Sequence, residues 1–339
     1  MKRRESLDRA TPGAPIRLAY VLAASHSGST LLSMLLNSHP EVCTVGELKV
    51  TSLGDVDTYR CSCRALVREC EFWTGIHDDM ARRGVEFDLA RPGTDLRSAG
   101  SAYVRRLLRP LHRGPALEAV RDIALSLSPS WRAHLSAVLE ANEQLMSCVL
   151  ARRGCRVIVD SSKDAIRLKY LLRSPGLDVR VIRLVRDGRA VMLTYVDPAG
   201  FADAADPALR AGGSGNVADP RYLRLGAAAA SLQWKRSNEE ADAAVATLPS
   251  GQWTEVRYED LCVQPEQTLR RLFAFLGVDA EARRANFRAV EHHVIGNGMR
   301  LDSASEVRLD DRWRTNLGEA ELRTFESIAG PLNRRFGYA

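Results

Sequence analysis

The sequence predicts an α/β fold in which helices cover both faces of a central parallel sheet, so that the molecule has three layers. Three observations support this prediction. Short apolar runs with the length of buried strands alternate with stretches of helical period. A polar turn and a helix follow each of the clearest strands, as in a sheet built from strand–helix units. Finally, 339 residues with 45% hydrophobic content are enough for a sizeable core.

The first strand–turn–helix unit occupies residues 16–47. The apolar run 18–24 predicts a buried strand, and a helix is expected from Leu31 to about His39. A helix N-terminus offers unpartnered amide groups and the positive end of the dipole, so a small polar turn before it favours a bound phosphate. The turn also fits an ordinary strand–helix connection, and it lacks the Gly-Lys-Ser/Thr of a nucleoside-triphosphate loop. Its residues are Ser25, His26, Ser27, Gly28, Ser29 and Thr30.

A second short strand is expected over residues 41–45, and it ends just before Glu47. Residues 49–84 are interpreted as an irregular segment. Residues 98–153 have a helical pattern that is clearest over 131–150. We therefore interpret residues 49–153 as an insertion with a helical region.

Two further strand-to-helix junctions follow the insertion. Strand 156–159 precedes Ser161 and Ser162, either of which is a good N-cap for a helix over 164–173. Strand 178–185 precedes Arg186 and a helix over 190–195. Because the carboxyl ends of parallel strands meet at one edge of a sheet, we expect the polar residues after the strands to form one ligand site.

The rest of the chain completes the same domain. Helices are expected over 222–246, over 265–276 and from Glu319 onward, and a strand over 252–256. Residues 198–220, rich in Gly, Ala and Asp, predict a mobile loop. Residues 1–15 predict a disordered tail. No linker or internal repeat divides the chain, so a single domain is expected over 16–339.

Charge and cysteine content restrict the class of protein. Lys and Arg exceed Asp and Glu by 48 to 42, a net charge of +6, without a dense basic run interleaved with aromatic residues. An anionic small ligand therefore fits better than a nucleic acid. No segment reaches the roughly 18 to 20 apolar residues of a membrane span. The seven cysteines form no dense, even framework, which favours a reduced, cytoplasmic protein.

Cys61, Cys63 and Cys70 are an exception, because they lie close together in the sequence. They could bind zinc with a fourth ligand from elsewhere in the chain, or form a disulfide. Their spacing matches no standard zinc module. Free thiols in a variable loop are therefore the favoured interpretation, and no metal site is predicted.

The junctions together resemble the sulfotransferases that use PAPS (3′-phosphoadenosine 5′-phosphosulfate), particularly the bacterial branch and the tyrosylprotein sulfotransferases. Residues 25–32, SHSGSTLL, resemble the family's 5′-phosphosulfate loop, and residues 185–194, VRDGRAVMLT, resemble its 3′-phosphate signature. Residues 257–277 and 308–314 contain two weaker matches. The resemblance spans most of the chain and implies a P-loop-like fold.

The same resemblance implies how the cofactor is held. Residues His26 to Thr30 would bind the phosphosulfate, in a loop where the family usually has Lys or Arg at the position of His26. Arg186 and the hydroxyl of Thr194, a position where the family usually has Ser, would bind the 3′-phosphate. Further candidates for contacts with the cofactor or its sulfonate are Tyr258, Asn297 and Arg308.

Sulfuryl transfer needs a general base and a cation at the leaving oxygen, but no metal. Glu47 is the preferred base, and its pKa is expected to be raised by burial so that it accepts a proton efficiently. His26 is the alternative base, because imidazole titrates near neutral pH. Lys163 resembles the family's lysine near the leaving oxygen, where a cation stabilises the charge that develops on the departing phosphate.

The predicted function is transfer of a sulfonate from PAPS, leaving PAP (3′-phosphoadenosine 5′-phosphate), to a hydroxyl or amine of a small-molecule, sugar or lipid acceptor. The acceptor pocket is expected in the segments 49–115 and 198–220, which do not identify the acceptor. The Arg- and Ala-rich composition is typical of a bacterial protein. Two alternatives remain open: a P-loop kinase, with Asp160 as its candidate magnesium ligand, and a PAP-binding protein without catalysis.

Overall fold

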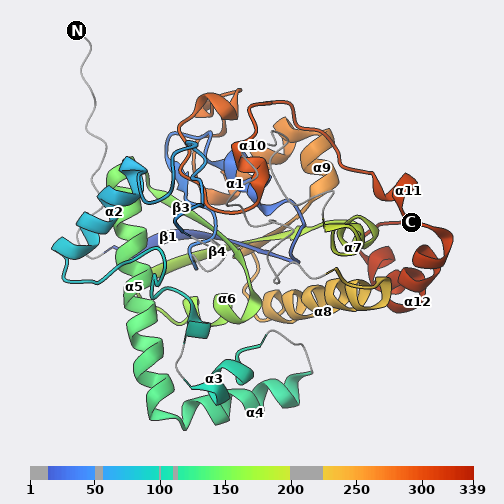
Figure 1. Cartoon of the computed structure of the whole chain (residues 1–339), viewed down its shortest axis with the longest axis horizontal. Coiled ribbons are helices and arrows are strands. Elements are labelled where there is room, and N and C mark those ends of the chain that lie inside the picture. The colour runs from blue at the N-terminus through green and yellow to red at the C-terminus, as the bar shows by residue number, and fades with distance from the viewer. Residues whose placement is uncertain (1–13, 50–55, 99–100, 110–113, 199–223) are drawn as a thin grey trace.

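The fold is a five-stranded parallel sheet between two layers of helices (Figure 1). The computed structural model describes residues 14–49, 56–98, 101–109, 114–198 and 224–339. The expected tail over 1–15 and mobile loop over 198–220 therefore lie almost wholly outside the described residues and stay predictions. The strands are β1 (Ile16–Ala23), β2 (Val42–Thr44), β3 (Val157–Lys163), β4 (Leu177–Val185) and β5 (Trp253–Arg257).

The strand order β2-β3-β1-β4-β5 puts β1 in the centre of the sheet. β1 pairs with β3 on one side and β4 on the other, with Ala19 opposite both Val159 and Arg180. Every pair is parallel, so all the strands end at the same edge. This confirms the predicted three-layer, P-loop-like fold.

The two faces of β1 carry separate parts of the core, because successive side chains of a strand point to opposite faces. Leu18, Tyr20 and Leu22 pack toward helices α5 (Pro129–Arg153) and α6 (Ala165–Leu171) and the end of α8 (Ala227–Val245). Ala19 and Val21 pack toward α1 (Ser29–Leu36) and α10 (Pro265–Leu276). Figure 1 shows α1, α10 and the short α9 (Tyr258–Val263) on one side of the sheet, and α6 and α8 on the other.

A third cluster joins the end of the chain to the sheet. Helices α7 (Gly188–Val196), α8 and α12 (Glu319–Arg335) pack together around the buried side chains of Trp234 and Phe325. The short α11 (Trp313–Asn316) contacts α7. The helices predicted over 222–246, over 265–276 and from Glu319 are confirmed within the described residues.

The insertion contains more helix than we predicted. The expectation of an irregular segment over 49–84 is wrong, because α2 (Glu71–Arg82) lies within it. The buried side chains of Phe72, Ile76 and Met80, four residues apart, form its inner face, and that spacing is the helical signal. The helical region is confirmed as α3 (Ala102–Leu107), α4 (Pro115–Ser126) and α5, with α3 and α4 beside one end of α5, away from the sheet (Figure 1).

Strand β3 continues further than predicted. Neither Ser161 nor Ser162 caps a helix, because both lie in β3 and the N-cap of α6 is Asp164. The Asp160 carboxylate accepts hydrogen bonds from the Ser162 amide (2.9 Å) and hydroxyl (2.5 Å), which occupies the side chain that was expected to cap. The pairing of β1 with β3 is irregular here, and the extension carries Lys163 to the sheet edge.

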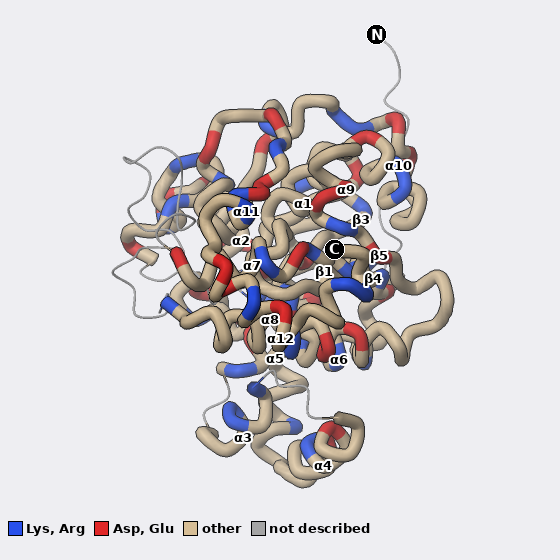
Figure 2. Tube along the Cα trace, turned by 90° about the vertical axis from the view of Figure 1, so that its right-hand side faces the viewer, with Lys and Arg blue, Asp and Glu red and all other residues tan. Residues whose placement is uncertain are grey.

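Charges of both signs are interleaved along the described trace, as Figure 2 shows. Within the described ranges, no helix has both the length and the apolar character needed to cross a bilayer.

Candidate active site

Four of the predicted site residues, Glu47, Lys163, His26 and Arg186, meet in two pairs at the carboxyl edge of the sheet. The Lys163 ammonium donates a hydrogen bond to Glu47, so the ends of β2 and β3 meet. The Arg186 guanidinium donates to the backbone oxygen of His26 (2.9 Å), so the ends of β1 and β4 meet. The two halves form one site, because Lys163, Arg186 and Glu47 all act electrostatically on the His26 imidazole.

The turn after β1 has a backbone that is shaped to receive an anion. His26 (φ 64°) and Gly28 (φ 89°) both adopt left-handed conformations. Gly28 is the N-cap of α1, which has no side-chain cap, and the first intrahelical bond runs from the Leu32 amide to Gly28 (3.0 Å). The amides before Leu32 therefore have no acceptor within the helix. A side chain at Gly28 would collide with the Tyr258 ring, which packs against this turn.

Two buried polar atoms at this turn lack partners among the described residues. Ser27 is 1% exposed, and its hydroxyl has no hydrogen-bond partner. The Nε of Arg186, a residue that is 6% exposed, is also unpartnered. Buried polar groups are nearly always hydrogen-bonded, so an orphaned hydroxyl and an orphaned guanidinium N–H beside a helix N-terminus fit a phosphate ligand.

Arg186 is held from several sides at the end of β4. Its Nη2 donates to the Asp310 carboxylate (3.0 Å) and backbone oxygen (3.1 Å), and its guanidinium stacks 4.3 Å from the Tyr258 ring centre. The Trp234 indole donates to the Arg186 carbonyl (3.2 Å). Arg186 therefore links the turn after β1, α9 and the segment that precedes α11.

Glu47 lies in a line of alternating charges. Besides Lys163, the Lys49 ammonium contacts its carboxylate at 3.5 Å, and Lys49 also pairs with Asp164 (3.2 Å). Asp164 in turn accepts from Arg97 (2.9 Å). The Glu47 side chain is 12% exposed, so these interactions are only weakly screened by solvent.

The expectation that burial raises the pKa of Glu47 is wrong. Burial does act in that direction, but the ammonium groups of Lys163 and Lys49 outweigh it and hold the pKa of Glu47 below its usual 4.5. In the free protein, Glu47 is an ionised carboxylate with two cationic partners. The fold brings Asp164 to Lys49 from 115 residues further along the chain. Sequence reasoning assigned neither residue to the site.

His26 is an uncharged imidazole at neutral pH. Burial, together with the charges of Lys163 and Arg186, lowers its pKa to about 4. Its ring packs edge-on against Tyr195, with centroids 4.9 Å apart. His26 is therefore a weaker base than the unperturbed imidazole that we considered, while it can still donate one hydrogen bond.

The other predicted residues differ in how close they come to this group. The segment of Asn297 lies at the site, because Ile295 pairs with Gly46 and Gly296 approaches Thr30. The Asn297 side chain itself accepts from the Met299 amide (3.1 Å).

Thr194, Arg308 and Arg189 have local partners. The Thr194 hydroxyl is buried and donates to Val191 of its own helix (2.7 Å). Arg308 has a side chain that is 79% exposed and pairs with Glu306, so Asp310 rather than Arg308 contacts Arg186. Arg189 pairs with Asp187 (2.8 Å).

Asp160 is not free to hold magnesium. It is fully buried, and its carboxylate accepts from the Arg167 guanidinium (2.9 Å), the Ser162 hydroxyl and the Leu48 amide (3.2 Å). These bonds fasten β3 to the Glu47 segment. The residue that the kinase alternative needs for its metal therefore has a structural role.

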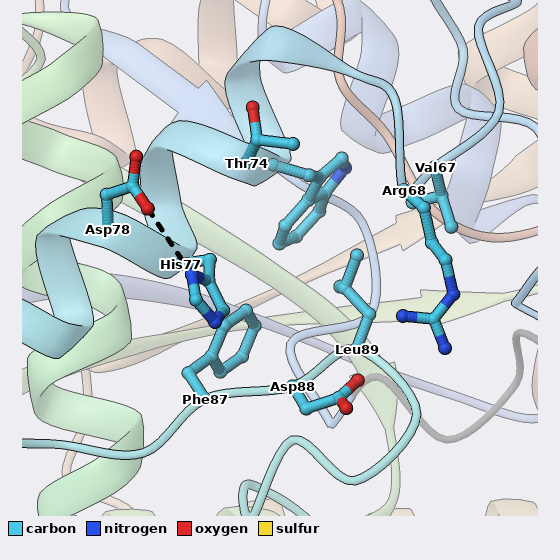
Figure 3. A pocket seen from close by; sticks show the side chains of 9 residues that line it. Val67, Arg68, Thr74, His77, Asp78, Phe87, Asp88 and Leu89 are labelled. Atoms are coloured by element: carbon cyan, nitrogen blue, oxygen red, sulfur yellow. Dashed lines mark hydrogen bonds and ion pairs between the residues drawn. The ribbon is translucent and has the colours of Figure 1, made fainter.

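A separate cavity of about 320 Å³ lies beside α2. Figure 3 shows the His77–Asp78 pair at this cavity, and Phe87 and Leu89 from the loop that follows α2. It lies within the segment that was expected to bind the acceptor, but none of the predicted site residues lines it. The lining residues are Val67, Arg68, Trp73, Thr74, His77, Asp78, Phe87, Asp88 and Leu89.

Comparison with known proteins assigns a family to this site. A model of the sulfotransferase family matches residues 178–282, which include Arg186, Thr194 and Tyr258. Human carbohydrate sulfotransferase 6 is 27% identical over 345 aligned residues, covering 94% of this chain and 80% of the human protein. The chain therefore contains a sulfotransferase family domain. Mouse carbohydrate sulfotransferase 5 is 30% identical over 179 residues, covering 50% of this chain and 44% of the mouse protein.

Solved structures with a similar arrangement are also sulfotransferases. A sulfotransferase domain from the curacin biosynthetic pathway aligns with a TM-score of 0.48 at 16% identity, covering 96% of this chain and 99% of that domain. A sulfotransferase from Mycobacterium avium aligns with the same TM-score of 0.48 at 14% identity, covering 97% and 79%. The family assignment rests on the sequence matches.

Proposed function

We propose that this sulfotransferase transfers the sulfonate of PAPS to a carbohydrate hydroxyl, with Glu47 as general base. The observation that carries the proposal is the meeting of two groups at one sheet edge. An anion-binding turn with an orphaned buried hydroxyl at Ser27 lies beside Arg186, and a carboxylate–ammonium pair, Glu47 and Lys163, lies next to both.

The turn and Arg186 would hold the two phosphate ends of the donor. The amides of the first turn of α1, with the hydroxyls of Ser27, Ser29 and Thr30, suit the 5′-phosphosulfate. Arg186, a charged planar fork with one free N–H, suits the 3′-phosphate, and Thr194 would add a hydroxyl. Tyr258, stacked under Arg186 and packed on Gly28, keeps both groups in place. Asn297 and Arg308 remain candidates for further contacts.

PAPS supplies an activated sulfonate, so the protein has only to align the acceptor and neutralise charge. Glu47 takes the proton of the acceptor hydroxyl, and Lys163 stabilises negative charge at the leaving oxygen. When Lys163 turns from Glu47 toward the donor, Glu47 loses one of the cations that lower its pKa and becomes a stronger base. In the free protein, Glu47 is thus paired with Lys163 and is a weak base, and it becomes a stronger base when the donor binds.

A carbohydrate acceptor is the choice that the relatives favour. The names of the matched curated proteins specify carbohydrate sulfotransferases, and the human protein aligns over 94% of this chain. A sugar hydroxyl is a poor nucleophile at neutral pH and needs a base such as Glu47.

The experiment is sulfonate transfer from PAPS to a panel of acceptors, followed by mass spectrometry and by release of PAP. The panel contains neutral mono- and oligosaccharides, a phenol and a fatty alcohol, and the control enzyme is Glu47→Gln. We expect a sulfated saccharide that depends on Glu47 and forms without magnesium. Sulfation of the phenol alone would contradict the acceptor. Absence of PAP release with every acceptor, despite PAP binding, would favour a non-catalytic binding protein.

A further inference from the structure

We propose that Cys61, Cys63, Cys70 and His293 bind one structural zinc ion. The sequence alone favoured free thiols, because the spacing of the three cysteines matches no standard zinc module. The fold brings His293 to them from the other end of the chain. The three Sγ atoms and one ring nitrogen all lie within 4.8 Å of one another. This inference does not depend on the proposed reaction.

Three of the six distances between the donor atoms are close to those of a tetrahedral site, and the other three are within 4.8 Å. The Cys70 Sγ lies 3.4 Å from the His293 Nδ1, and the Cys61 Sγ lies 3.7 Å from the same nitrogen. The Sγ atoms of Cys63 and Cys70 are 3.6 Å apart. A tetrahedral ion with bonds of about 2.3 Å to sulfur and about 2.0–2.1 Å to nitrogen places its ligands roughly 3.6–3.8 Å apart. A disulfide would need about 2.05 Å between the sulfurs.

A tight turn and a helix start position the three thiols. Arg60 and Leu66 form an antiparallel bridge around a tight turn, in which Arg64 (φ 73°) donates to the Cys61 carbonyl (2.8 Å). This turn places Cys61 and Cys63 side by side. Cys70 is the N-cap of α2 but makes no side-chain cap bond, so its sulfur is available to the cluster.

His293 is oriented as a metal ligand. Its Nε2 pairs with the Glu291 carboxylate (2.9 Å), which leaves Nδ1 facing the sulfurs. His293 as a whole is 7% exposed. Its ring stacks on that of Phe72, with the ring centroids 4.3 Å apart and the ring planes 3° from parallel. A carboxylate on the far nitrogen is the usual partner of a zinc-bound histidine, because it fixes both the tautomer and the ring direction.

The donor set selects the ion. Three thiolates and one imidazole prefer Zn²⁺ over the hard cations that oxygen ligands bind, and four protein ligands close the coordination sphere, as in structural sites. The thiols release protons when the ion binds.

The ion would fasten the backbone that adjoins the active site. Next to His293, the Val294 amide donates to the Ser62 hydroxyl (2.7 Å). Ile295 then pairs with Gly46, directly before Glu47, and a side chain at Gly46 would collide with the Ile295 oxygen. The zinc site therefore joins residues 61–70 to the segment that supports Glu47.

The test is the zinc content of the full-length chain, purified under reducing conditions. A mercurial thiol reagent should release about one zinc per chain, detected with a chromogenic zinc indicator and by elemental analysis. Cys63→Ser should lose most of this zinc. Cys155→Ser, which removes a thiol outside the cluster, should keep it. Wild-type protein reloaded with Co²⁺ should show the intense visible absorption of tetrahedral thiolate ligation.

The cobalt spectrum keeps the test decisive if Cys63→Ser fails to fold. Zinc-free wild-type protein whose cobalt form lacks thiolate absorption would overturn the proposal. A Cys63–Cys70 disulfide found by mass spectrometry in freshly purified protein would also overturn it, as would full zinc retention by Cys63→Ser. None of these readouts involves sulfonate transfer, so failure here and failure of the proposed reaction are distinguishable.

Discussion

The sheet edge and the cysteine–histidine cluster are two sites of opposite chemistry that share one stretch of chain. At the sheet edge, backbone amides, hydroxyls and Arg186 offer hydrogen-bond donors suited to an anion. In the cluster, three thiols and an imidazole offer soft ligands suited to a cation. Residues 293–297 touch both, with His293 in the cluster and Gly296 against Thr30.

The difference between them lies in where the chemical groups come from. The anion site is assembled from loops that directly follow strands, so each part of it has a local sequence signature. The cation site depends on one histidine more than two hundred residues away from the cysteines. We therefore expect substitutions at the sheet edge to change the reaction rate. Substitutions in the cysteine–histidine cluster should change the stability of the segment that supports Glu47.

Replacement of the base should have the largest effect at the edge. Glu47→Gln keeps the shape of the side chain but cannot accept the acceptor's proton, so kcat should fall by about 10²–10⁴-fold. PAP affinity should change little, because Glu47 pairs with Lys163 and Lys49 rather than with the anion turn. Steady-state kinetics and calorimetry on the same preparation check both. A wild-type kcat in Glu47→Gln would remove Glu47 from catalysis.

A pair of serines, Ser27 in the turn before α1 and Ser33 within α1, separates ligand binding from packing. Ser27 and Ser33 both have buried hydroxyls without partners, but only Ser27 lies in the turn before α1. Ser27→Ala should weaken PAP binding by about three- to tenfold, the loss of one hydrogen bond, whereas Ser33→Ala should not. Neither variant should lower the melting temperature, since each removes an unsatisfied group. Equal PAP affinity in the two variants would contradict the assignment of the turn.

The pH dependence of stability should report the ion pairs at Glu47. Because the cations Lys163 and Lys49 lower its pKa, Glu47 contributes stability above its unfolded pKa, and that stability is lost as pH falls through the lower folded value. Asp164 acts in the same direction. Urea unfolding should give constant stability from neutral pH down to about 5 and a decline below it.

Lys163→Met sharpens this test. With one ammonium gone, burial acts more strongly on Glu47 and its folded pKa rises toward the unfolded value, so the loss of stability below about pH 5 should be smaller than in wild type. Superimposable profiles for the two proteins would show that Lys163 does not control the Glu47 charge. This is the smallest of the expected effects.

Most of the fold could be predicted from the sequence, because its signals are local. The strands, the turn from His26 to Thr30 and the polar junction at Arg186 depend on neighbouring residues. The parts that were missed depend on contacts. Asp160 of β3 accepts from the distant Leu48 amide, and the pKa of Glu47 falls chiefly because Lys163, from another strand, pairs with it. These partners come from other parts of the chain, so no local spacing pattern encodes the contacts.

The cysteine–histidine cluster also depends on a contact that could not be predicted from the sequence. The three cysteines were visible in the sequence, but the adjacent His292 and His293 in an irregular segment gave no signal that either belongs with them. His293 reaches the thiols through contacts between distant segments, among them its stacking on Phe72 of α2, a helix that we did not predict.

The most direct test of the account is calorimetric titration of PAP into wild type, Arg186→Ala and Arg189→Ala, without magnesium. Each variant removes one positive charge, at positions three residues apart. Arg189 pairs with Asp187, whereas the Arg186 guanidinium contacts the turn after β1. We predict that wild type and Arg189→Ala bind alike and that Arg186→Ala binds about 10- to 100-fold more weakly, as expected for a charged hydrogen bond. Equal binding by Arg186→Ala, or no binding by wild type, would contradict the claim that this sheet edge holds the sulfonate donor.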